Sequence, residues 1–519
     1  MFDRDGSRRR GSCEAGPPVK ADVSSDHWGD PAADKVAKAT GVYRAPDDPG
    51  SLYNATRAIG ARDAWSRRDT RGRAITGQGV TVALLDSGIV PVAGLDGAGK
   101  VVQGPDLSLE NDQDSLLGLD TFGHGTHMAG IIGAADPTGV DRTGKPVNPG
   151  PADELGVAPG VALLGTADGS TDVTQVIAAL DWVGQHARDD GMNVRVVNLS
   201  FGTGSLQPYQ IDPLAAAAEN AWRHGLVVVV SGGNDGQGAG RLTDPAIDPY
   251  VVAVGAADPQ LSVNGWNSPV VAPFSNGGSG QRHVDLIAPG TSIASLRDPG
   301  SSIDVDHPEG LVNGDTTGRL FRGSGTSQAA AVVSGAAALL VQANPALTPD
   351  QVKAALVTTA DPLRGVSPLH QGAGELDVTD ALDAVQPGRV VRSVASAVQT
   401  ATPAAGTGSV EASRAGGDLV DPASGAVLSG EVDVQGHQLD TARWATASRA
   451  GTAWTGGGWN GAAWSDAGWA AARWSGAGWA AARWSDADWA SGRWSGARWS
   501  AARWSAARWS AARWSAGSW

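Results

Sequence analysis

The chain has 519 residues, a formal net charge of −15 and one cysteine. This length is sufficient for one large hydrophobic core with appendages, and the single Cys13 excludes an intramolecular disulfide. The charge is unevenly spread, because residues 441–519 contain nine Arg and three Asp and so carry +6, which leaves −21 for the remainder. An acidic body argues against nucleic acid as a partner. No apolar run reaches the length of a transmembrane helix.

Residues 1–50 are rich in Gly, Pro, Asp and Arg and show no hydrophobic periodicity. This composition predicts a mostly disordered N-terminal arm. The first residues, MFDRDGSRRRGSCEAG, carry charge but are not followed by an apolar stretch. The sequence as it stands therefore predicts no secretory signal.

From Gly79 onward, short apolar runs alternate with segments of helical periodicity. Four runs rich in β-branched residues have the character of strands covered on both faces: 80–85, 195–199, 226–230 and 250–254. Alternation of such strands with helices predicts an α/β domain with a largely parallel sheet. In such sheets function collects at the carboxyl ends of the strands, and Asp86 and Asn234 follow two of the runs.

Two of the intervening helices have clear start signals. Asp172 and Gln175 are placed as a capping pair, and one apolar face follows, made of Val173, Val176, Ile177 and Leu180. The segment 348–351, Thr-Pro-Asp-Gln, places a cap, a proline and a glutamine at the positions that begin a second helix.

Three glycine-rich turns contain the residue types of a serine-nucleophile hydrolase. They are VALLDSGI around Asp86, HGTHMAG beginning at His124 and GTSQAA around Ser327. A serine hydroxyl needs a base to accept its proton, and an imidazole needs a carboxylate to hold its tautomer and stabilise its cation. Apolar residues after Ser327 predict a buried helix, which would place the nucleophile at a helix N-terminus.

The order and neighbours of these motifs resemble those of the subtilases, the subtilisin-like serine proteases, over roughly residues 51–390. The resemblance implies a subtilisin-like three-layer fold and a serine endopeptidase that forms an acyl-enzyme on polypeptide substrates. It implies that Ser327 attacks, that His124 shuttles the proton and that Asp86 orients His124. No cofactor is required for this chemistry.

The resemblance also implies further site residues. Asn234, in LVVVVSGGNDG, would donate its side-chain amide to the oxyanion. The extended substrate would pair with a segment that follows the run RVVNL, and glycines would line the opposite wall of its pocket. The substrate-binding residues are then Ser200, Phe201, Gly202, Gly232 and Gly233.

The chain departs from the family pattern after the nucleophile. Gln328 and Ala331 stand where Met and Pro are usual, and Gln328 adjoins Ser327 closely enough to alter the local hydrogen bonding. His127, one helical turn after His124, is interpreted as a packing residue. Neither departure removes a catalytic group. The C-terminal tail, described below, motivates an alternative function: a surface-binding or adhesion protein whose subtilase-like scaffold is not catalytic.

Subtilases often bind calcium for stability, and acidic loop residues such as Asp106, Asp112 and Asp114 are present. They do not form a spaced ligand loop of the EF-hand kind. Structural calcium is therefore an expectation without assigned ligands.

Residues 391–440 lose the alternating pattern, which predicts a linker, and residues 441–519 form a tail rich in Trp, Arg, Ser and Ala. From Trp454 to Trp519 a tryptophan occurs at every fifth position, fourteen in all. A period of five suits a square β-solenoid, or equally a low-complexity expansion without fixed fold.

Rows of Trp and Arg predict attachment of this tail to a cell wall, a membrane surface or other copies of itself. The family resemblance implies an extracellular or cell-surface protein, in conflict with the missing secretory signal. The sequence alone does not decide between export, which the resemblance implies, and retention inside the cell, which the missing signal implies.

Overall fold

The computed structural model describes residues 42–107, 119–135, 155–167, 172–259, 261–262, 265–266, 269–415, 419–420 and 427–463. Its centre is an eight-stranded sheet in the order β10-β6-β5-β4-β1-β3-β2, with β9 paired to β6. Every pair is parallel except β6 with β9. The strands are β1 Thr81–Asp86, β2 Val101–Asp106, β3 Ala162–Ala167, β4 Val194–Leu199, β5 Val227–Ser231, β6 Val252–Asp258, β9 Val270–Val271 and β10 Leu286–Pro289.

The β-branched runs form the middle of this sheet. Every residue of β1, β4 and β5 is buried, as expected when helices cover both faces of a parallel sheet. The four predicted runs coincide with β1, β4, β5 and β6, and each starts within one or two residues of the observed strand. The prediction of an α/β fold with a largely parallel sheet is confirmed.

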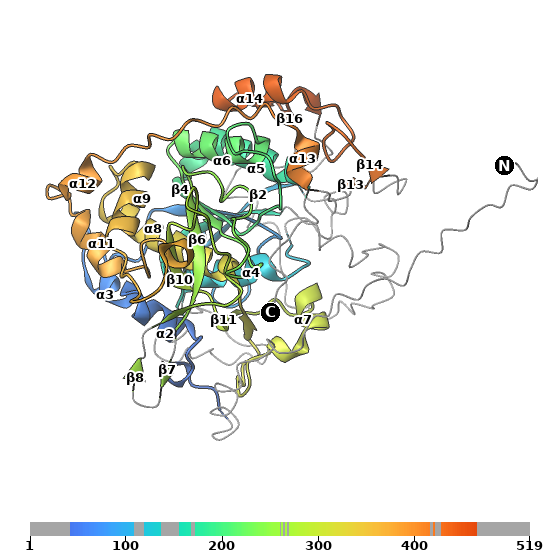
Figure 1. Cartoon of the computed structure of the whole chain (residues 1–519). Helices are drawn as coiled ribbons and strands as arrows, with labels where there is room; N and C mark the ends of the chain where they lie inside the picture. The colour runs from blue at the N-terminus through green and yellow to red at the C-terminus, as the bar shows by residue number, and fades with distance from the viewer. Residues whose placement is uncertain are drawn as a thin grey trace, which may run out of the picture.

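Two pairs of helices pack on the sheet. α4 (His124–Gly133) lies along α8 (Thr326–Ala343), and α8 also contacts β4, β5, β6 and β10. α5 (Val173–His186) and α6 (Pro213–Arg223) lie side by side in the upper part of Figure 1. Both predicted caps are confirmed, as capping boxes of α5 and of α9 (Pro349–Thr358). Among the described helices, α8 is long and apolar enough to cross a membrane, but all of it is buried inside the domain.

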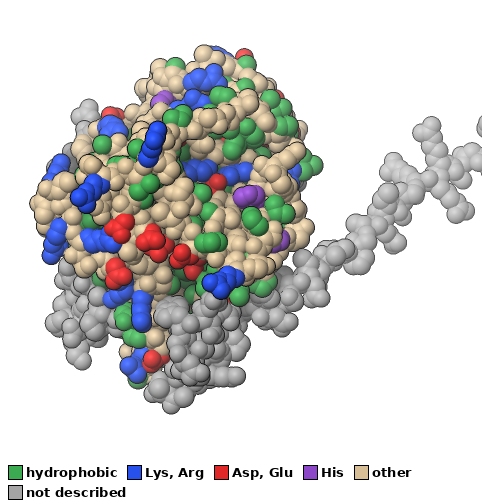
Figure 2. Space-filling view, turned by 60° about the vertical axis from the view of Figure 1, so that its left-hand side comes forward, with side chains coloured by type: hydrophobic (Ala, Val, Ile, Leu, Met, Phe, Trp, Pro, Cys, Tyr) green, Lys and Arg blue, Asp and Glu red, His purple; other side chains and the backbone are tan. Residues whose placement is uncertain are grey.

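Shorter elements complete the described part of the chain. Before and around the sheet these are η2 Ala45–Asp47, α2 Leu52–Ala58, α3 Ala61–Ser66, η3 Asp189–Gly191, β7 Leu261–Ser262, β8 Gly265–Trp266, β11 Ile293–Leu296, α7 Ser302–Asp306, η4 Pro308–Gly310 and β12 Leu320–Gly323. After α9 they are α10 Pro368–Gln371, α11 Val378–Ala384, α12 Arg392–Ala395, α13 Val410–Arg414, β13 Leu419–Val420, β14 Val427–Leu428, α14 Thr441–Arg449, β15 Trp454–Thr455, β16 Gly458–Trp459 and β17 Ala462–Ala463. Both signs of charge occur on the face shown in Figure 2, with acidic side chains gathered near its centre.

The predicted N-terminal arm is folded from residue 42 onward. Its Asp48 forms a buried ion pair with Arg322, with 2.8 Å between Oδ2 and Nη2. The two residues lie 274 positions apart, so the composition of the arm could not indicate this contact. Residues 1–41 lie outside the described residues.

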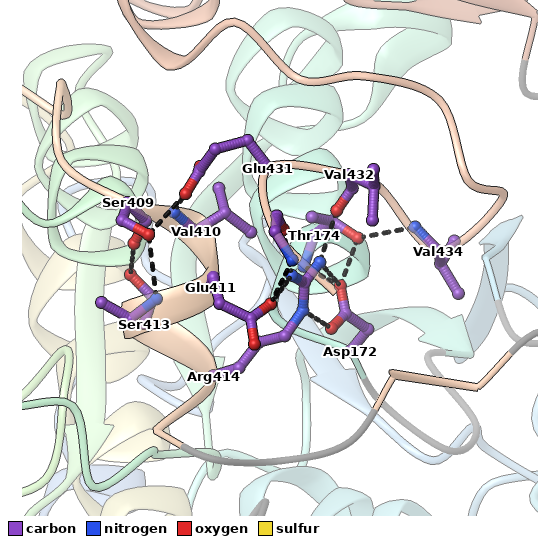
Figure 3. A network of polar contacts seen from close by, with 12 residues as sticks. Asp172, Thr174, Ser409, Val410, Glu411, Ser413, Arg414, Glu431, Val432 and Val434 are labelled. Carbon is purple, nitrogen blue, oxygen red and sulfur yellow. Dashed lines mark hydrogen bonds and ion pairs between the residues drawn. The ribbon is translucent and has the colours of Figure 1, made fainter. Parts of the chain in front are cut away.

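Residues 392–463 are called here the C-terminal wrap. In their described parts α12 packs on α9, whereas α13, α14 and β15 pack on α5 and α6. The sequence predicted a linker over much of this range, but Arg414 of α13 is buried and forms an ion pair with Asp172, the N-cap of α5, at 2.6 Å. Arg414 also pairs with Glu411 at 3.0 Å and donates to the carbonyl oxygens of Gly430 and Val432 (Figure 3). These added bonds satisfy the donors of a guanidinium that burial removes from water.

Tryptophan side chains attach the end of the wrap to α5. Nε1 of Trp444 and Nε1 of Trp459 each donate to Oδ2 of Asp181 at 2.8 Å. Nε1 of Trp454 donates to the carbonyl oxygen of Ala178 at 2.8 Å. The first two tryptophans of the repeat, Trp454 and Trp459, are therefore docked on the domain.

The docked part of the repeat is a small antiparallel meander, β15-β16-β17. Its two turns have positive φ at both central residues, 57° and 87° at Gly456 and Gly457 and 52° and 81° at Asn460 and Gly461. Such turns favour Gly and Asn. The repeat from residue 464 to 519 lies outside the described residues, so the choice between solenoid and disorder stays a prediction.

Candidate active site

Asp86 and His124 are in direct contact. Asp86 ends β1 and His124 begins α4, and the Nδ1 of His124 lies 2.6 Å from the Oδ1 of Asp86. Both side chains are fully buried. A carboxylate on Nδ1 fixes which imidazole nitrogen carries the proton and leaves Nε2 for proton transfer.

A second acid, which the sequence analysis missed, holds the turn before α4. Asp120 accepts hydrogen bonds from the backbone N–H groups of Gly123 and Thr126, each at 2.7 Å. It also accepts from the hydroxyl of Ser87 at 2.7 Å, and the N–H of Ser87 donates to Oδ1 of Asp86 at 2.8 Å. Complete burial raises the pKa of Asp120, although these hydrogen bonds act to lower it. The sequence signal was an acid four residues before HGTH.

His127 lies beside the site but points into the fold. Its Nε2 lies 3.3 Å from the carbonyl oxygen of Ile293 and 3.2 Å from that of Phe321. Burial, with the nearby His124, lowers the pKa of His127 to about 3. A neutral imidazole bonded to two carbonyl groups has the packing role predicted for it.

Ser327 is the second residue of α8, as the apolar run after it predicted. Asn234 lies next to this helix start, since its Oδ1 accepts from both the N–H and the hydroxyl of Thr326, each at 2.9 Å. The Nδ2 of Asn234 is buried and has no hydrogen-bond partner in the described part of the chain. Thr326, another residue that the sequence analysis missed, thus orients an amide whose donors remain available.

The first turns of α4 and α8 lie level with each other. Gly335 is eight residues along α8 from Ser327, and a Cβ placed on it would lie 3.3 Å from the carbonyl oxygen of Ile132. Ile132 is in turn eight residues along α4 from His124. Because both helices begin at the carboxyl edge of the parallel sheet, equal offsets bring Ser327 and His124 to the same level.

The predicted substrate segment lies beside the start of α8. The hydroxyl of Ser200 donates to the carbonyl oxygen of Ser327 at 3.3 Å and accepts from Nδ2 of Asn198 at 3.0 Å. Phe201 is buried in the hydrophobic core, so it can shape a pocket only from behind its wall.

The glycines of the two predicted pocket walls converge on Thr243, which the sequence analysis also missed. A Cβ on Gly202 would lie 2.6 Å from Oγ1 of Thr243, and one on Gly233 would lie 2.9 Å from its Cγ2. Gly233 also has a φ of 110°, a conformation that favours glycine. The carbonyl oxygen of Gly232 accepts from the N–H of Thr243 at 3.2 Å. Thr243 therefore closes the space between the walls.

No group of three or more His, Cys, Asp or Glu side chains within the described ranges could hold a metal ion. Asp106 ends β2, whereas Asp112 and Asp114 lie outside the described residues. The expectation of calcium therefore remains without ligands.

Comparisons with known proteins agree with this arrangement. A sequence model of the subtilase family matches residues 77–381. The chain is 33% identical over 347 residues to "Serine protease AprX" of Bacillus subtilis (strain 168), covering 66% of this chain and 74% of that protein. It is 33% identical over 300 residues to "Subtilisin Savinase" of Lederbergia lenta, covering 56% and 87%. It is also 33% identical over 291 residues to "Extracellular serine proteinase" of Thermus sp. (strain Rt41A), covering 55% and 56%.

The family match includes Asp86, His124, Asn234 and Ser327 within one continuous range. It covers the parallel sheet, with Asp86 at the end of β1 and Asn234 after β5, and the helices α4 and α8, which carry His124 and Ser327. The chain therefore belongs to the subtilase family and is a serine-type endopeptidase.

Proposed function

We propose that Asp86, His124 and Ser327 form the catalytic triad that hydrolyses peptide bonds. The observation that carries the proposal is the 2.6 Å contact between Nδ1 of His124, at the start of α4, and Oδ1 of Asp86, at the end of β1. The equal offsets along α4 and α8 support a position of Ser327 level with His124. The Oγ of Ser327 attacks the carbonyl carbon of the scissile bond while His124 accepts its proton. His124 then protonates the leaving amine, and water hydrolyses the acyl-enzyme by the same two steps.

Asn234 supplies one donor to the oxyanion in this mechanism. Its Nδ2 is buried and meets no hydrogen-bond acceptor within the described ranges, and its Oδ1 is anchored by Thr326. Both observations support this role, since a donor fixed before the reaction needs no reorganisation during it. The N–H of Ser327, at the N-terminus of α8, is the second donor.

The substrate is an extended polypeptide in this proposal. It pairs along Ser200, Phe201 and Gly202, and one side chain enters the space bounded by Gly202, Gly232 and Gly233. Thr243 lies between these walls, so the size and polarity of its side chain set which residues fit. Main-chain pairing binds polypeptides broadly and leaves selectivity to this pocket.

We further propose that the protein acts outside the cell or at its surface, held there by the tail. One relative is named an extracellular proteinase, which supports the compartment. The two docked pentads, WTGGG and WNGAA, contain no charged residue, whereas Arg precedes many of the later tryptophans. Because the positive charge of the repeat lies in the later pentads, we propose that these pentads bind an anionic surface. A non-catalytic adhesion protein is not favoured, because none of the proposed catalytic groups is missing.

A fluorophosphonate probe tests the triad. Purified protein and the Ser327→Ala variant are compared for labelling and for cleavage of an unstructured polypeptide. We expect both signals in the wild type and neither in the variant, with circular dichroism unchanged. Cleavage that persists in Ser327→Ala, or a folded wild type that neither labels nor cleaves, would contradict the proposal.

A further inference from the structure

Asp244 is a fully buried acid that accepts no hydrogen bond. It directly follows Thr243, which closes the space between the proposed pocket walls, and it is 0% exposed. Neither of its carboxyl oxygen atoms has a hydrogen-bond partner in the part of the chain that the structure describes. A buried carboxylate without donors destabilises a fold, so the neutral acid is the form that fits this position.

The side chain of Asp212 lies within hydrogen-bonding reach of Asp244 and, in contrast, has donors on both of its oxygen atoms. Its Oδ1 caps α6 and accepts from the N–H of Leu214 at 2.8 Å. Its Oδ2 accepts from the hydroxyl groups of Ser205 at 3.0 Å and of Ser413 at 2.8 Å. These bonds favour an ionised Asp212, which is therefore the acceptor for a proton carried by Asp244.

The surrounding charges keep this proton on the pair of acids. Two carboxylates in contact in a buried site repel each other strongly, so such pairs share one proton. Burial and the neighbouring charges of Asp212 and Asp248 raise the pKa of Asp244 well above its usual range, whereas Arg241 acts in the opposite direction. From the C-terminal wrap, α13 faces the pair with the hydroxyl group of Ser413.

Both ends of the loop 203–212 are bound to Asp244. At its start, the N–H of Thr203 donates to the carbonyl oxygen of Asp244 at 2.9 Å, and the N–H of Asp244 donates back at 3.0 Å. At its end lies Asp212, whose side chain meets that of Asp244. Thr203 directly follows Gly202 of the proposed substrate segment. A change at Asp244 therefore reaches the wall formed by this segment and, through the adjoining Thr243, the space between the walls.

We propose that Asp244 is a positioning residue whose carboxylic O–H donates to Asp212, closes the loop 203–212 and holds the substrate segment 200–202 in the geometry that binds polypeptide. The pair attracts while it shares a proton, and it repels once both acids are ionised. Substrate binding therefore weakens when the pH rises past the point at which the pair loses its proton. This inference rests on the proposed function.

Two substitutions separate the shared proton from the space that the side chain fills. Asp244→Asn keeps a neutral donor of the same shape, whereas Asp244→Leu has no donor. On an internally quenched peptide at pH 7, we expect KM of the Asn variant to stay within about twofold of the parent. We expect KM of the Leu variant to rise about three- to thirtyfold, with kcat changed by less than about twofold. Asp63→Asn, at an exposed position of α3, is the control.

Infrared difference spectroscopy detects the shared proton itself. The spectra are recorded in a Ser327→Ala background, which prevents self-digestion. We expect the C=O stretching band of a protonated carboxylic acid at pH 7, lost in Asp244→Asn and retained in Asp63→Asn. With rising pH, loss of this band and a rise in KM of the active parent should follow the same titration, while KM of the Asn variant stays constant.

Three results would overturn the inference: no such band at pH 7, a band that is lost while KM of the parent stays constant, or a Leu variant that binds peptide as tightly as the parent. A band that persists to the highest pH at which the chain is folded, with constant KM, supports it. The spectra and the pH profile decide the question even where Asp244→Leu does not fold. Failure of the triad proposal is recognised separately, because then Ser327→Ala still cleaves peptide, or the wild type does not.

Discussion

The proposed catalytic residues of this chain are positioned by neighbours to which the proposal gives no chemical step. Thr326 holds the oxygen of the Asn234 amide with two hydrogen bonds of 2.9 Å, and among the described residues the amide nitrogen has no acceptor. Asp120 similarly fixes the turn that precedes His124. The sequence motifs predicted Asp86, His124, Ser327 and Asn234, but Thr326, Thr243 and Asp120 have roles that depend on which loops meet in space.

Asn234→Ala tests the proposed oxyanion donor. We expect kcat to fall by about 10²–10³-fold, the magnitude known for such a donor in a subtilisin, with KM changed little. The reason is that the hydrogen bond strengthens only as negative charge develops on the substrate oxygen. Steady-state kinetics on a peptide substrate measure the effect. The control is Asn193→Ala, an amide that directly precedes β4, at the amino end of that strand. A loss that falls mainly on KM would contradict this role.

At the scale of elements, α5 contains a buried carboxylate, Asp181, whose hydrogen-bond donors lie in a segment far along the chain. Asp181 accepts from Trp444, Trp459 and the hydroxyl of Ser448, and burial raises its pKa to about 6 although these bonds act to lower it. The sequence predicted the capping box and the apolar face of α5 correctly. It could not predict that the outer face of α5 is covered, since the covering residues lie about 260 positions later.

The raised pKa of Asp181 makes docking of the wrap depend on pH. Between about pH 4 and about pH 6 the folded chain binds this proton more tightly than the unfolded chain, so the free energy of unfolding falls as pH rises. Asp181→Asn has no such proton. We expect the stability of the parent relative to this variant to decrease by up to about 3 kcal/mol from about pH 4 to about pH 7.

Urea unfolding of both proteins in a Ser327→Ala background measures this difference without self-digestion. The comparison between the two proteins cancels the contributions of other buried acids, such as Glu375, whose pKa burial also raises to about 7. Parallel pH profiles for the two proteins would contradict the assignment.

At the scale of the whole molecule, the folded part of the chain extends beyond the residues that the subtilase family model matches. The match ends at residue 381, whereas the described wrap continues to residue 463 and covers α5 and α6. The Ala- and Gly-rich composition of residues 391–440 predicted a linker. Nothing in the sequence indicates that Arg414 pairs with Asp172 across 242 positions. The regular α/β part was predictable from periodicity, but the wrap depends on a few long-range polar contacts.

Arg414→Met tests whether the wrap stabilises the domain. The substitution leaves Asp172 and the carbonyl groups of residues 430 and 432 without their buried cation. We expect the free energy of unfolding to fall by about 3–5 kcal/mol, the usual cost of removing one member of a buried pair. The control is Arg449→Met on α14, an exposed position, where a change within about 0.5 kcal/mol is expected. Equal effects of the two substitutions in urea unfolding would contradict the role of the ion pair.

The left-handed turns of the docked meander bear on how this chain can evolve. Near-identical repeats gain and lose copies readily by unequal recombination. The Gly-Gly pair at 456–457 and the Asn-Gly pair at 460–461 do not recur after residue 463. Both turns of the described meander thus lie in two pentads, and copies added or deleted after residue 463 leave those turns intact. Related strains can therefore differ in tail length, and with it in reach and avidity for a surface, while inheriting the same peptidase.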